Sequence, residues 1–240
     1  MFSYTYETRY GDYKDFDTLK PGAVLDIIQD ISIKDSARLG YGLDNLRKMN
    51  MAWLMQGINL RFENPVKTIT DIEVYTAVKS MKGATSERGC ILKQNGKTVA
   101  KSIANWFVFD TEKMRVSKIP AQMLSLYEIY DFEDEFFTFK KPELREIEEA
   151  KYTVKVANKD IDTNRHLNNQ KGADILMDAL PFDFYFNDIK LLYKKPAYLG
   201  DELDVCIKQI PNGFYVHTQT KEKEICVAGT FEKTEFVFNY

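Results

Sequence analysis

No stretch of the sequence approaches the roughly 18 consecutive apolar residues that a membrane-spanning helix needs. Cysteine is scarce: Cys90, Cys206 and Cys226 are too few and too widely spaced for a disulfide framework or a zinc site. An excess of positive charge is also missing, since the net charge is −3, which argues against nucleic acid as a partner. The N-terminal residues lack the apolar core of a secretion signal. We therefore expect a soluble, cytoplasmic, globular protein that uses no metal and no cofactor.

The two halves of the sequence repeat each other in the same order. Residues 14–18 read KDFDT and residues 159–163 read KDIDT, and each is followed by a Gly-Ala pair that opens an apolar helical pattern. A proline followed by an aspartate and an alternating strand also recurs, at Pro65 and at Pro196. Several matches in one order indicate that a single structural unit has been duplicated.

Each half reads as one helix followed mostly by strands. Apolar residues recur at helical spacing between Pro21 and Gly40, and again over about residues 170–180. Alternating segments predict strands over residues 53–62, 72–81, 85–93, 98–109 and 152–156. Asn95-Gly96 and Asn212-Gly213 predict hairpin turns. One helix against antiparallel strands, twice, predicts an α+β fold.

Between the halves, residues 131–149 carry eight acidic and three basic side chains, with Pro142 inside the segment. Such a strongly charged stretch is typical of a solvated linker. The sequence therefore divides into residues 1–130, a linker over 131–149, and residues 150–240.

Polar side chains are concentrated in an insertion that only the second copy has, at residues 160–169. It contains His166, one of only two histidines; the other, His217, lies in an alternating segment and is expected to be a structural strand residue. If the insertion is extended, Asp162, Asn164 and His166 point to the same side, because side chains alternate with period two. The first copy starts its helix from Thr18-Leu19-Lys20-Pro21, with no histidine or asparagine, so a helix start in this fold does not require them.

Each of the three side chains has a plausible chemical task. His166 would take a proton from water at neutral pH. The amide of Asn164 would donate to a carbonyl oxygen that becomes an oxyanion, and the start of the following helix would add further backbone donors. Asp162 would orient either partner or hold the imidazolium charge. A purely structural loop is the alternative, because Asn and Asp are common in helix caps, and we expect Asn168 or Asn169 to be one.

The run Asp-x-Asn-x-His-x-Asn-Asn at residues 162–169 resembles the signature of the acyl-acyl carrier protein (acyl-ACP) thioesterases of plants and bacteria. Other segments occur in the order expected of that family: Trp53-Leu54-Met55-Gln56, Asn105-Trp106-Phe107-Val108 and Leu192-Tyr193-Lys194-Lys195. The resemblance implies a double hotdog, in which two antiparallel sheets are each wrapped around a long helix. It also implies hydrolysis of a fatty acyl-ACP thioester to free fatty acid and holo-ACP.

By the same resemblance, residues 1–130 form a hotdog that binds the acyl chain, and residues 150–240 form a catalytic one. The motif match assigns the catalytic positions to Asp162, Asn164 and His166. Trp53, Met55, Ile27 and Ile28 are candidates for lining an acyl tunnel, although apolar residues at such spacing are also typical of an ordinary core.

The sequence departs from the family in one place. Where the family usually has a glutamate, followed in plants by a cysteine, this chain has Pro196-Ala197. Cys206 and Cys226 fall within predicted strands and are expected to be small buried hydrophobes. Attack by water assisted by His166 is therefore favoured over a cysteine nucleophile. Asp201 and Glu202 are candidates to replace the glutamate by proximity in sequence alone.

The partner implied by the resemblance is an acyl carrier protein. Because such proteins are acidic, the docking surface should be locally basic. Lys194, Lys195 and Arg165 are candidates near the motif, and Arg47 and Lys48 form a second basic pair.

Three other functions stay open: an acyl-CoA thioesterase, a hotdog hydratase or dehydratase, and a non-catalytic protein that binds acyl carriers. The chain length of the substrate is not predicted, and either a monomer or a homodimer is compatible with one chain that already holds two hotdogs.

Overall fold

The computed structural model describes residues 1–15, 18–66 and 70–234. The chain divides into two compact units, residues 1–139 and residues 140–234. Both are α+β units, and within each unit the strand pairs that the structure describes are antiparallel. None of the described helices is long and apolar enough to cross a membrane.

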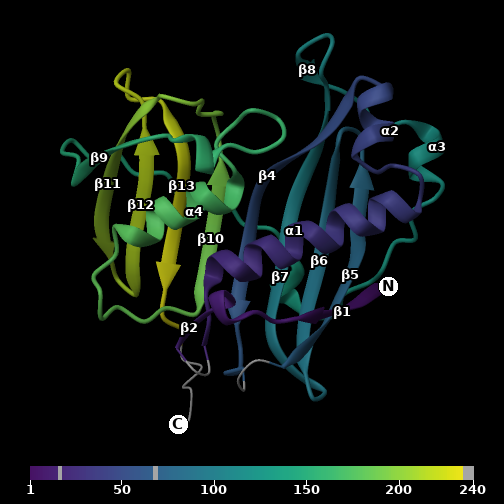
Figure 1. Cartoon of the computed structure of the whole chain (residues 1–240), viewed down its shortest axis with the longest axis horizontal. Helices are drawn as coiled ribbons and strands as arrows, with labels where there is room; N and C mark the ends of the chain where they lie inside the picture. Colours follow the sequence, from purple (N-terminus) through teal and green to yellow (C-terminus); the bar gives the residue numbers. More distant parts are fainter. Residues whose placement is uncertain (16–17, 67–69, 235–240) are drawn as a thin grey trace. The chain divides into compact units, whose positions relative to one another are not determined.

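The first unit is a five-stranded sheet with a long helix on one face (Figure 1). The strands lie in the order β1-β5-β6-β7-β4, and a short β8 pairs with β7. The strand bounds are β1 (Phe2–Glu7), β4 (Met51–Phe62), β5 (Asp71–Lys82), β6 (Thr85–Gln94), β7 (Lys97–Asp110) and β8 (Arg115–Val116). A two-stranded ribbon joins β2 (Tyr13–Asp15) to β3 (Thr18–Leu19). The remaining elements are η1 (Tyr10–Asp12), α1 (Pro21–Arg38), α2 (Leu43–Lys48), α3 (Ala121–Leu124) and η2 (Glu135–Phe137).

Helix α1 crosses the sheet of the first unit because one of its sides is continuously apolar. Val24, Ile27, Ile28 and Ile31 are at most 1% exposed, at the spacing that places residues on one side of a helix. Pro21 begins the helix, and Gly40, with a φ of +86°, follows its end, as predicted.

The second unit repeats the architecture of the first. Its strands lie in the order β9-β11-β12-β13-β10, with α4 (Asn169–Asp178) packed on β13 and β12. The strand bounds are β9 (Tyr152–Lys155), β10 (Asp188–Tyr193), β11 (Glu202–Ile210), β12 (Gly213–Gln219) and β13 (Ile225–Glu232). At ten residues, α4 is shorter than the long helix that was expected, whereas α1 has eighteen.

The duplication is also visible in a local motif, but in a different register from the one that the sequence indicated. A short 3-10 helix follows the first strand of each unit, η1 in the first and η3 (Asn158–Asp160) in the second. Asp12 accepts a hydrogen bond from the backbone of Arg9 (2.8 Å), and Asp160 accepts one from the backbone of Ala157 (2.9 Å). Asp12 is therefore the structural equivalent of Asp160, whereas the match of KDFDT with KDIDT would pair Asp160 with Asp15. Phe16 and Asp17 of KDFDT lie outside the described residues.

The hairpin at Asn95-Gly96 is confirmed, since both residues have positive φ (50° and 76°) between β6 and β7. The turn of the second hairpin lies one residue earlier in the sequence than predicted. Its turn is formed by Pro211 and Asn212, and Gly213 is already the first residue of β12. A Cβ atom on Gly213 would lie 1.9 Å from the carbonyl oxygen of Phe231, so glycine is needed there for close packing of strands rather than for turning.

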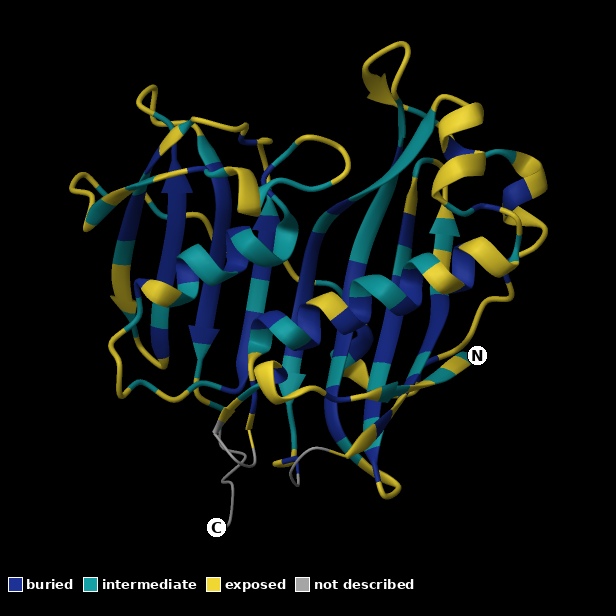
Figure 2. Ribbon diagram, viewed as in Figure 1, coloured by how far each residue is buried: buried dark blue, intermediate teal, exposed yellow. Residues whose placement is uncertain are grey.

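The expected solvated linker is not solvated in its first half. Phe132 and Phe137 are 7% and 3% exposed and pack on Ala77 and Ile103 of the first unit. Their rings lie 4.2 Å apart, stacked, and the ring of Phe132 fills the space that a side chain at Gly89 would occupy. The charged residues that suggested solvation alternate with these aromatic anchors. Figure 2 shows the dark, buried strands of each unit against the exposed loops.

Candidate active site

The polar motif of the second unit forms a closed turn. Ile161 and Leu167 make an isolated antiparallel bridge, the amide of Asp162 donates to the carbonyl of His166 (2.8 Å), and that of Arg165 donates to the carbonyl of Asp162 (3.0 Å). Arg165 takes a φ of +63°, which lets the chain reverse. The segment is therefore not extended, and the condition under which the three side chains would alternate onto one side is not met.

One carboxylate organises this turn. Asp162 Oδ1 accepts hydrogen bonds from the amides of Asn164 (2.8 Å) and His166 (3.2 Å), and its Oδ2 accepts a long one from Asn164 Nδ2 (3.5 Å). The three predicted residues are thus brought together, but through the aspartate and the backbone. Asp162 and His166 are half-buried and Asn164 is exposed, so none of the three residues is fully buried.

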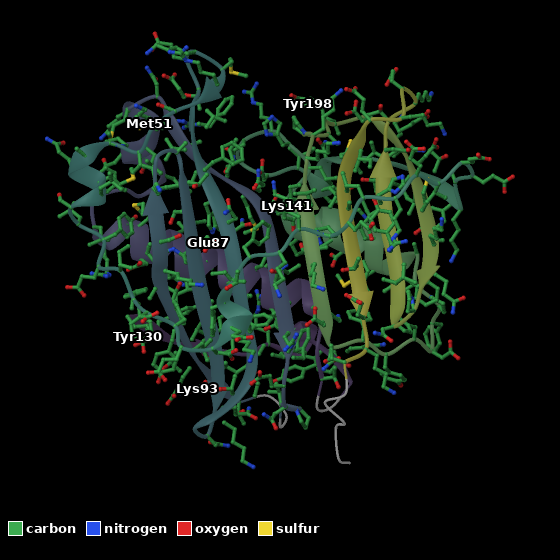
Figure 3. All side chains as sticks on the ribbon, turned by 180° about the vertical axis from the view of Figure 1, so that it is seen from behind. Met51, Glu87, Lys93, Tyr130, Lys141 and Tyr198 are labelled. Atoms are coloured by element: carbon green, nitrogen blue, oxygen red, sulfur yellow. The ribbon has the colours of Figure 1, made fainter. Side chains whose placement is uncertain are left out.

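The imidazole of His166 contacts an aromatic ring that the sequence did not single out. The rings of His166 and Tyr198 lie 5.1 Å apart in an edge-to-face arrangement with an interplanar angle of 76°. Tyr198, labelled in Figure 3, belongs to the segment that follows β10. Nothing in the spacing of the sequence marked this aromatic residue as a neighbour of the motif.

Hydrogen bonds hold that loop against the motif. Leu167 donates its amide to the carbonyl of Ala197 (2.8 Å), and Asp201 Oδ2 accepts from the amide of Tyr198 (2.8 Å). Glu202, the other candidate to replace the family glutamate, forms an ion pair with Lys221 (2.8 Å). Asp201 therefore shapes the loop that carries Tyr198, and Glu202 is engaged at the start of β11.

Helix α4 begins directly after the turn and is fixed at its first residue. Asn168 is the N-cap, as expected, and its side chain accepts from the amides of Gln170 (2.8 Å) and Lys171 (3.3 Å). The hydroxyl of Tyr193 donates to the carbonyl of Asn169 (3.1 Å). Because the cap already occupies two first-turn donors, the expectation that the helix start adds donors for an oxyanion is wrong for Gln170 and Lys171.

The three cysteines and the second histidine lie on strands of the sheets. All three thiols are free and buried, as expected for Cys206 and Cys226. Burial raises the pKa of the Cys226 thiol to about 11 and that of Cys90 to about 12. His217 is 1% exposed on β12, with Nε2 3.3 Å from Gln219 Oε1, and burial lowers its pKa. The prediction of a structural strand histidine is consistent with this placement.

The basic residues near the motif are not equivalent. Lys195 forms an ion pair with Glu224, and this partner raises its pKa. Lys194 and Arg165 are exposed, and no ion pair joins either of them to another described residue.

The four candidate acyl-binding residues all belong to the first unit. Ile27 and Ile28 are 1% exposed on α1, and Met55 is 7% exposed on β4. Trp53 packs against a cluster that includes Val108, next to α2. Their placement is that of core residues.

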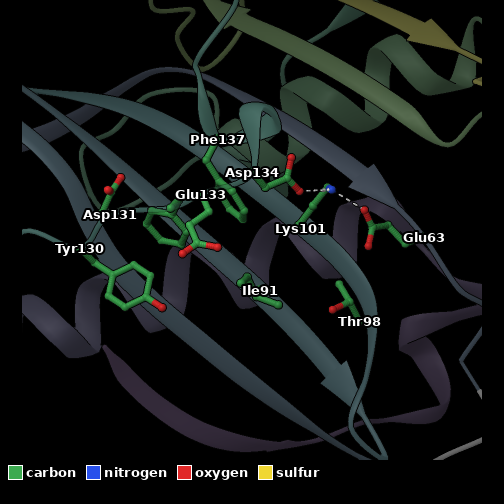
Figure 4. Close-up of a pocket in the computed structure, with 10 residues that line it drawn as sticks. Glu63, Ile91, Thr98, Lys101, Tyr130, Asp131, Glu133, Asp134 and Phe137 are labelled. Atoms are coloured by element: carbon green, nitrogen blue, oxygen red, sulfur yellow. Dashed lines mark hydrogen bonds and ion pairs between the residues drawn. The ribbon is translucent and has the colours of Figure 1, made fainter.

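The first unit also has an open cavity of about 360 Å³ (Figure 4), which contains none of these four residues. Lys101 lies in it between Glu63 (2.5 Å) and Asp134 (2.6 Å), and Tyr130 and Phe137 contribute aromatic walls. Most of its ionisable side chains are carboxylates, so it does not suit the anionic head of a fatty acid.

Comparison with known proteins bears on both units. The family model for the acyl-ACP thioesterase N-terminal domain matches residues 1–127, and the model for the C-terminal domain of the same family matches residues 141–233. No curated protein matches the sequence.

Solved structures with the same fold include an acyl-ACP thioesterase from Bacteroides thetaiotaomicron, at 17% identity and a TM-score of 0.84, covering 96% of each chain. The 12:0-ACP thioesterase from Umbellularia californica has 16% identity and a TM-score of 0.83, again with 96% of each chain covered. A putative oleoyl thioesterase from Lactobacillus plantarum has 17% identity and a TM-score of 0.82, covering 98% of this chain and 97% of that one.

Proposed function

Because the chain belongs to the acyl-ACP thioesterase family, we infer that it is a thioester hydrolase that cleaves fatty acyl-ACP into free fatty acid and holo-ACP. The observation that carries this function is the match of both family models, which together span nearly all of the chain. We read each unit as one hotdog, with the acyl chain bound by the first and the reaction carried out by the second.

In the mechanism that we propose, His166 removes a proton from a water molecule as the water oxygen attacks the thioester carbon. The carbonyl oxygen becomes an oxyanion, to which the exposed amide of Asn164 donates a hydrogen bond. The C–S bond then breaks, the imidazolium returns its proton to the leaving sulfur, and the products are a carboxylic acid and a thiol. No covalent enzyme intermediate is formed.

Two side chains position these groups without touching the substrate. Asp162 accepts the amides of Asn164 and His166, so its task is to hold the turn rather than to bond the imidazole. The ring of Tyr198 packs edge-to-face on the imidazole, an arrangement worth about 0.5–1.5 kcal/mol beyond its buried area. Lys194 and Arg165, which are exposed and carry positive charge, are proposed to attract the acidic carrier, whereas Lys195 is engaged with Glu224.

The test is the release of free thiol from acyl-ACP by the wild-type chain and by His166→Ala. Loss of the general base should lower kcat by about 10²-fold or more. Thr163→Ala is the matched control, because Thr163 is an exposed residue of the same turn, and its activity should stay within about twofold of wild type. A panel of acyl-ACP and acyl-CoA substrates of different lengths then gives the preferred chain and carrier.

Three results would contradict the proposal. Unchanged turnover by a folded His166→Ala variant removes this residue from the mechanism. Hydration of an unsaturated acyl thioester without thiol release indicates a hydratase. Tight binding of acyl-ACP without turnover by the wild type indicates a carrier-binding protein.

A further inference from the structure

One end of the first unit exposes positive charge on three segments that the fold brings together. Helix α2 leads into Asn50, whose carbonyl accepts the amide of Thr111 (2.9 Å) and whose side chain donates to Glu112 (3.2 Å) at the turn between β7 and β8. After β8, Ile119 donates its amide to the carbonyl of Gly83 (2.9 Å), in the turn between β5 and β6. We call residues 43–51, 82–83 and 110–118 the basic face.

The basic face differs in sign from the chain as a whole. It contains six basic and three acidic side chains, a net charge of +3, in a chain whose net charge is −3. Its basic members are all exposed: Arg47, Lys48, Lys82, Lys113, Arg115 and Lys118. Lys113 lies 3.5 Å from Asp110, whereas no ion pair joins the other five to any residue that the structure describes. Unpaired cations on one face attract a partner of opposite charge.

Apolar side chains are exposed between these charges. Met114 at the tip of the turn is 72% exposed, Val116 is 55%, Leu43 is 56% and Met49 is 41%. Methionine and arginine are enriched in protein interfaces, where lysine and glutamate are depleted from the centre. Met114 and Arg115, adjacent in sequence, therefore provide an apolar and a guanidinium anchor for one partner.

The basic face is supported from beneath by packed residues. Leu46 of α2, Val108 of β7 and Ile119 belong to one buried cluster, against which Trp53 packs. Asp110 accepts the amides of Lys113 (2.8 Å) and Glu112 (3.1 Å), and these bonds lower the pKa of its carboxyl. The turn that carries Met114 is thus held by a carboxylate that stays ionised, and its side chains are presented on a fixed support, which lowers the entropy cost of binding.

We propose that the basic face is a docking surface for the acidic carrier protein that delivers the fatty acyl substrate. This proposal rests on the proposed function, because it takes the partner from the reaction. A lipid bilayer is less suited to the face, since α2 has only six residues and cannot lie along a membrane as an amphipathic helix with a continuous apolar side. The carrier supplies what the face lacks: carboxylates for five unpaired cations.

The experiment measures the affinity of fluorescently labelled holo-ACP for the full chain by anisotropy. In Arg47→Glu/Arg115→Glu, the dissociation constant should rise about tenfold or more, because two attractive contacts become repulsive. Met114→Ser should raise it about threefold through the lost apolar contact. The affinity of the wild type should fall with added salt.

Lys97→Glu/Lys208→Glu is the matched control. Both residues are exposed, outside the basic face, and Lys97 lies at the opposite end of β7. This variant has the same net charge as the test variant, so a general effect of charge would weaken carrier binding equally in both. Circular dichroism establishes that all variants are folded.

An unchanged dissociation constant for Arg47→Glu/Arg115→Glu, or an equal rise in the control, would overturn the proposal. So would loss of binding to phosphatidylglycerol vesicles in the test variant without loss of carrier affinity, which would assign the face to a membrane. The hydrolysis assay separates this inference from the proposed function. If the wild type releases thiol but the test variant binds the carrier as tightly as the wild type does, only the docking surface is refuted. If carrier binding changes as expected but the wild type releases no thiol, only the hydrolysis is refuted.

Discussion

The thiols of Cys90, Cys206 and Cys226 are all buried, and burial raises the pKa of each. Because the thiolate is the reactive form, we expect iodoacetamide at about pH 8 to leave hydrolysis unchanged and to produce no adduct by mass spectrometry. In denaturant all three cysteines should be alkylated, which serves as the control. Rapid inactivation with an adduct on Cys226 would instead favour a cysteine nucleophile.

His217 should make the stability of the protein depend on pH. Burial lowers its pKa in the folded state, so the folded protein binds fewer protons than the unfolded chain just below the usual histidine pKa of about 6.5. The free energy of unfolding should therefore decrease as the pH falls below about 6.5, and His217→Gln should make this decrease smaller. Urea unfolding between about pH 5.5 and 7.5 measures both slopes; equal slopes for the two proteins would contradict the prediction.

The identity of the candidate catalytic residues followed from the sequence, but their geometry did not. The pattern of residue types, Asp162, Asn164 and His166, was sufficient to single out the turn. Whether they lie on a strand or in a turn depends on which groups donate hydrogen bonds to the carboxylate of Asp162. The donors are the backbone amides two and four residues further on, which closes a turn. The neighbour Tyr198 could not be predicted, because only the tertiary contact between two loops places its ring beside His166.

At the scale of elements, α1 is joined to its sheet by a buried ion pair. Asp35 Oδ2 lies 2.7 Å from Arg88 Nη1 of β6, and the two side chains are 5% and 7% exposed. Asp35→Ala should lower the free energy of unfolding by about 3–5 kcal/mol, because it leaves a buried guanidinium without its partner. Urea denaturation measures this change.

Asp30→Ala is the control for that prediction, since Asp30 pairs with Lys34 on the exposed side of the same helix, where both side chains are 48% exposed. It should change the free energy of unfolding by no more than about 0.5–1 kcal/mol. Equal losses in the two variants would show that helix propensity, rather than the buried pair, is responsible.

Strands were the most predictable elements, and the exceptions have physical reasons. The expected strand at residues 98–109 is found as Lys97–Asp110, because alternation with period two reports directly which side chains face the sheet's core. The turn predicted at Asn212-Gly213 lies one residue earlier in the sequence. Gly213 belongs to the strand, where the absence of a side chain allows close packing against Phe231. A sequence pattern does not distinguish these two uses of glycine.

At the scale of the whole molecule, residues 131–139 should behave as part of the first unit. Phe132 is 7% exposed and packs on its sheet, so Phe132→Ala in the full chain should cost about 3–5 kcal/mol of unfolding free energy. Hydrogen exchange should then increase in β5, β6 and β7. Phe182→Ala, at a residue that is 97% exposed, should have no measurable effect.

If hydrogen exchange in the Phe132→Ala variant increased only in β11, β12 and β13, residues 131–139 would belong to the second unit and the prediction would be wrong. Charge composition alone suggested a solvated linker over residues 131–149. Four phenylalanines lie among those charges, at Phe132, Phe136, Phe137 and Phe139, and composition averages over the alternation that lets such rings face inward while carboxylates face outward.

The start of α1 has a consequence for the stoichiometry of the protein. The first unit enters the helix from Lys20 and Pro21, and residues 8–21 contain no histidine and no asparagine. Under the proposed mechanism, one chain of 27.9 kDa carries a single reaction centre for two copies of the fold, and titration with a tight-binding inhibitor should saturate at one equivalent per polypeptide. If the first unit binds the acyl chain as proposed, it does not need an imidazole, and mutations in it should alter which lipids are accepted without abolishing turnover.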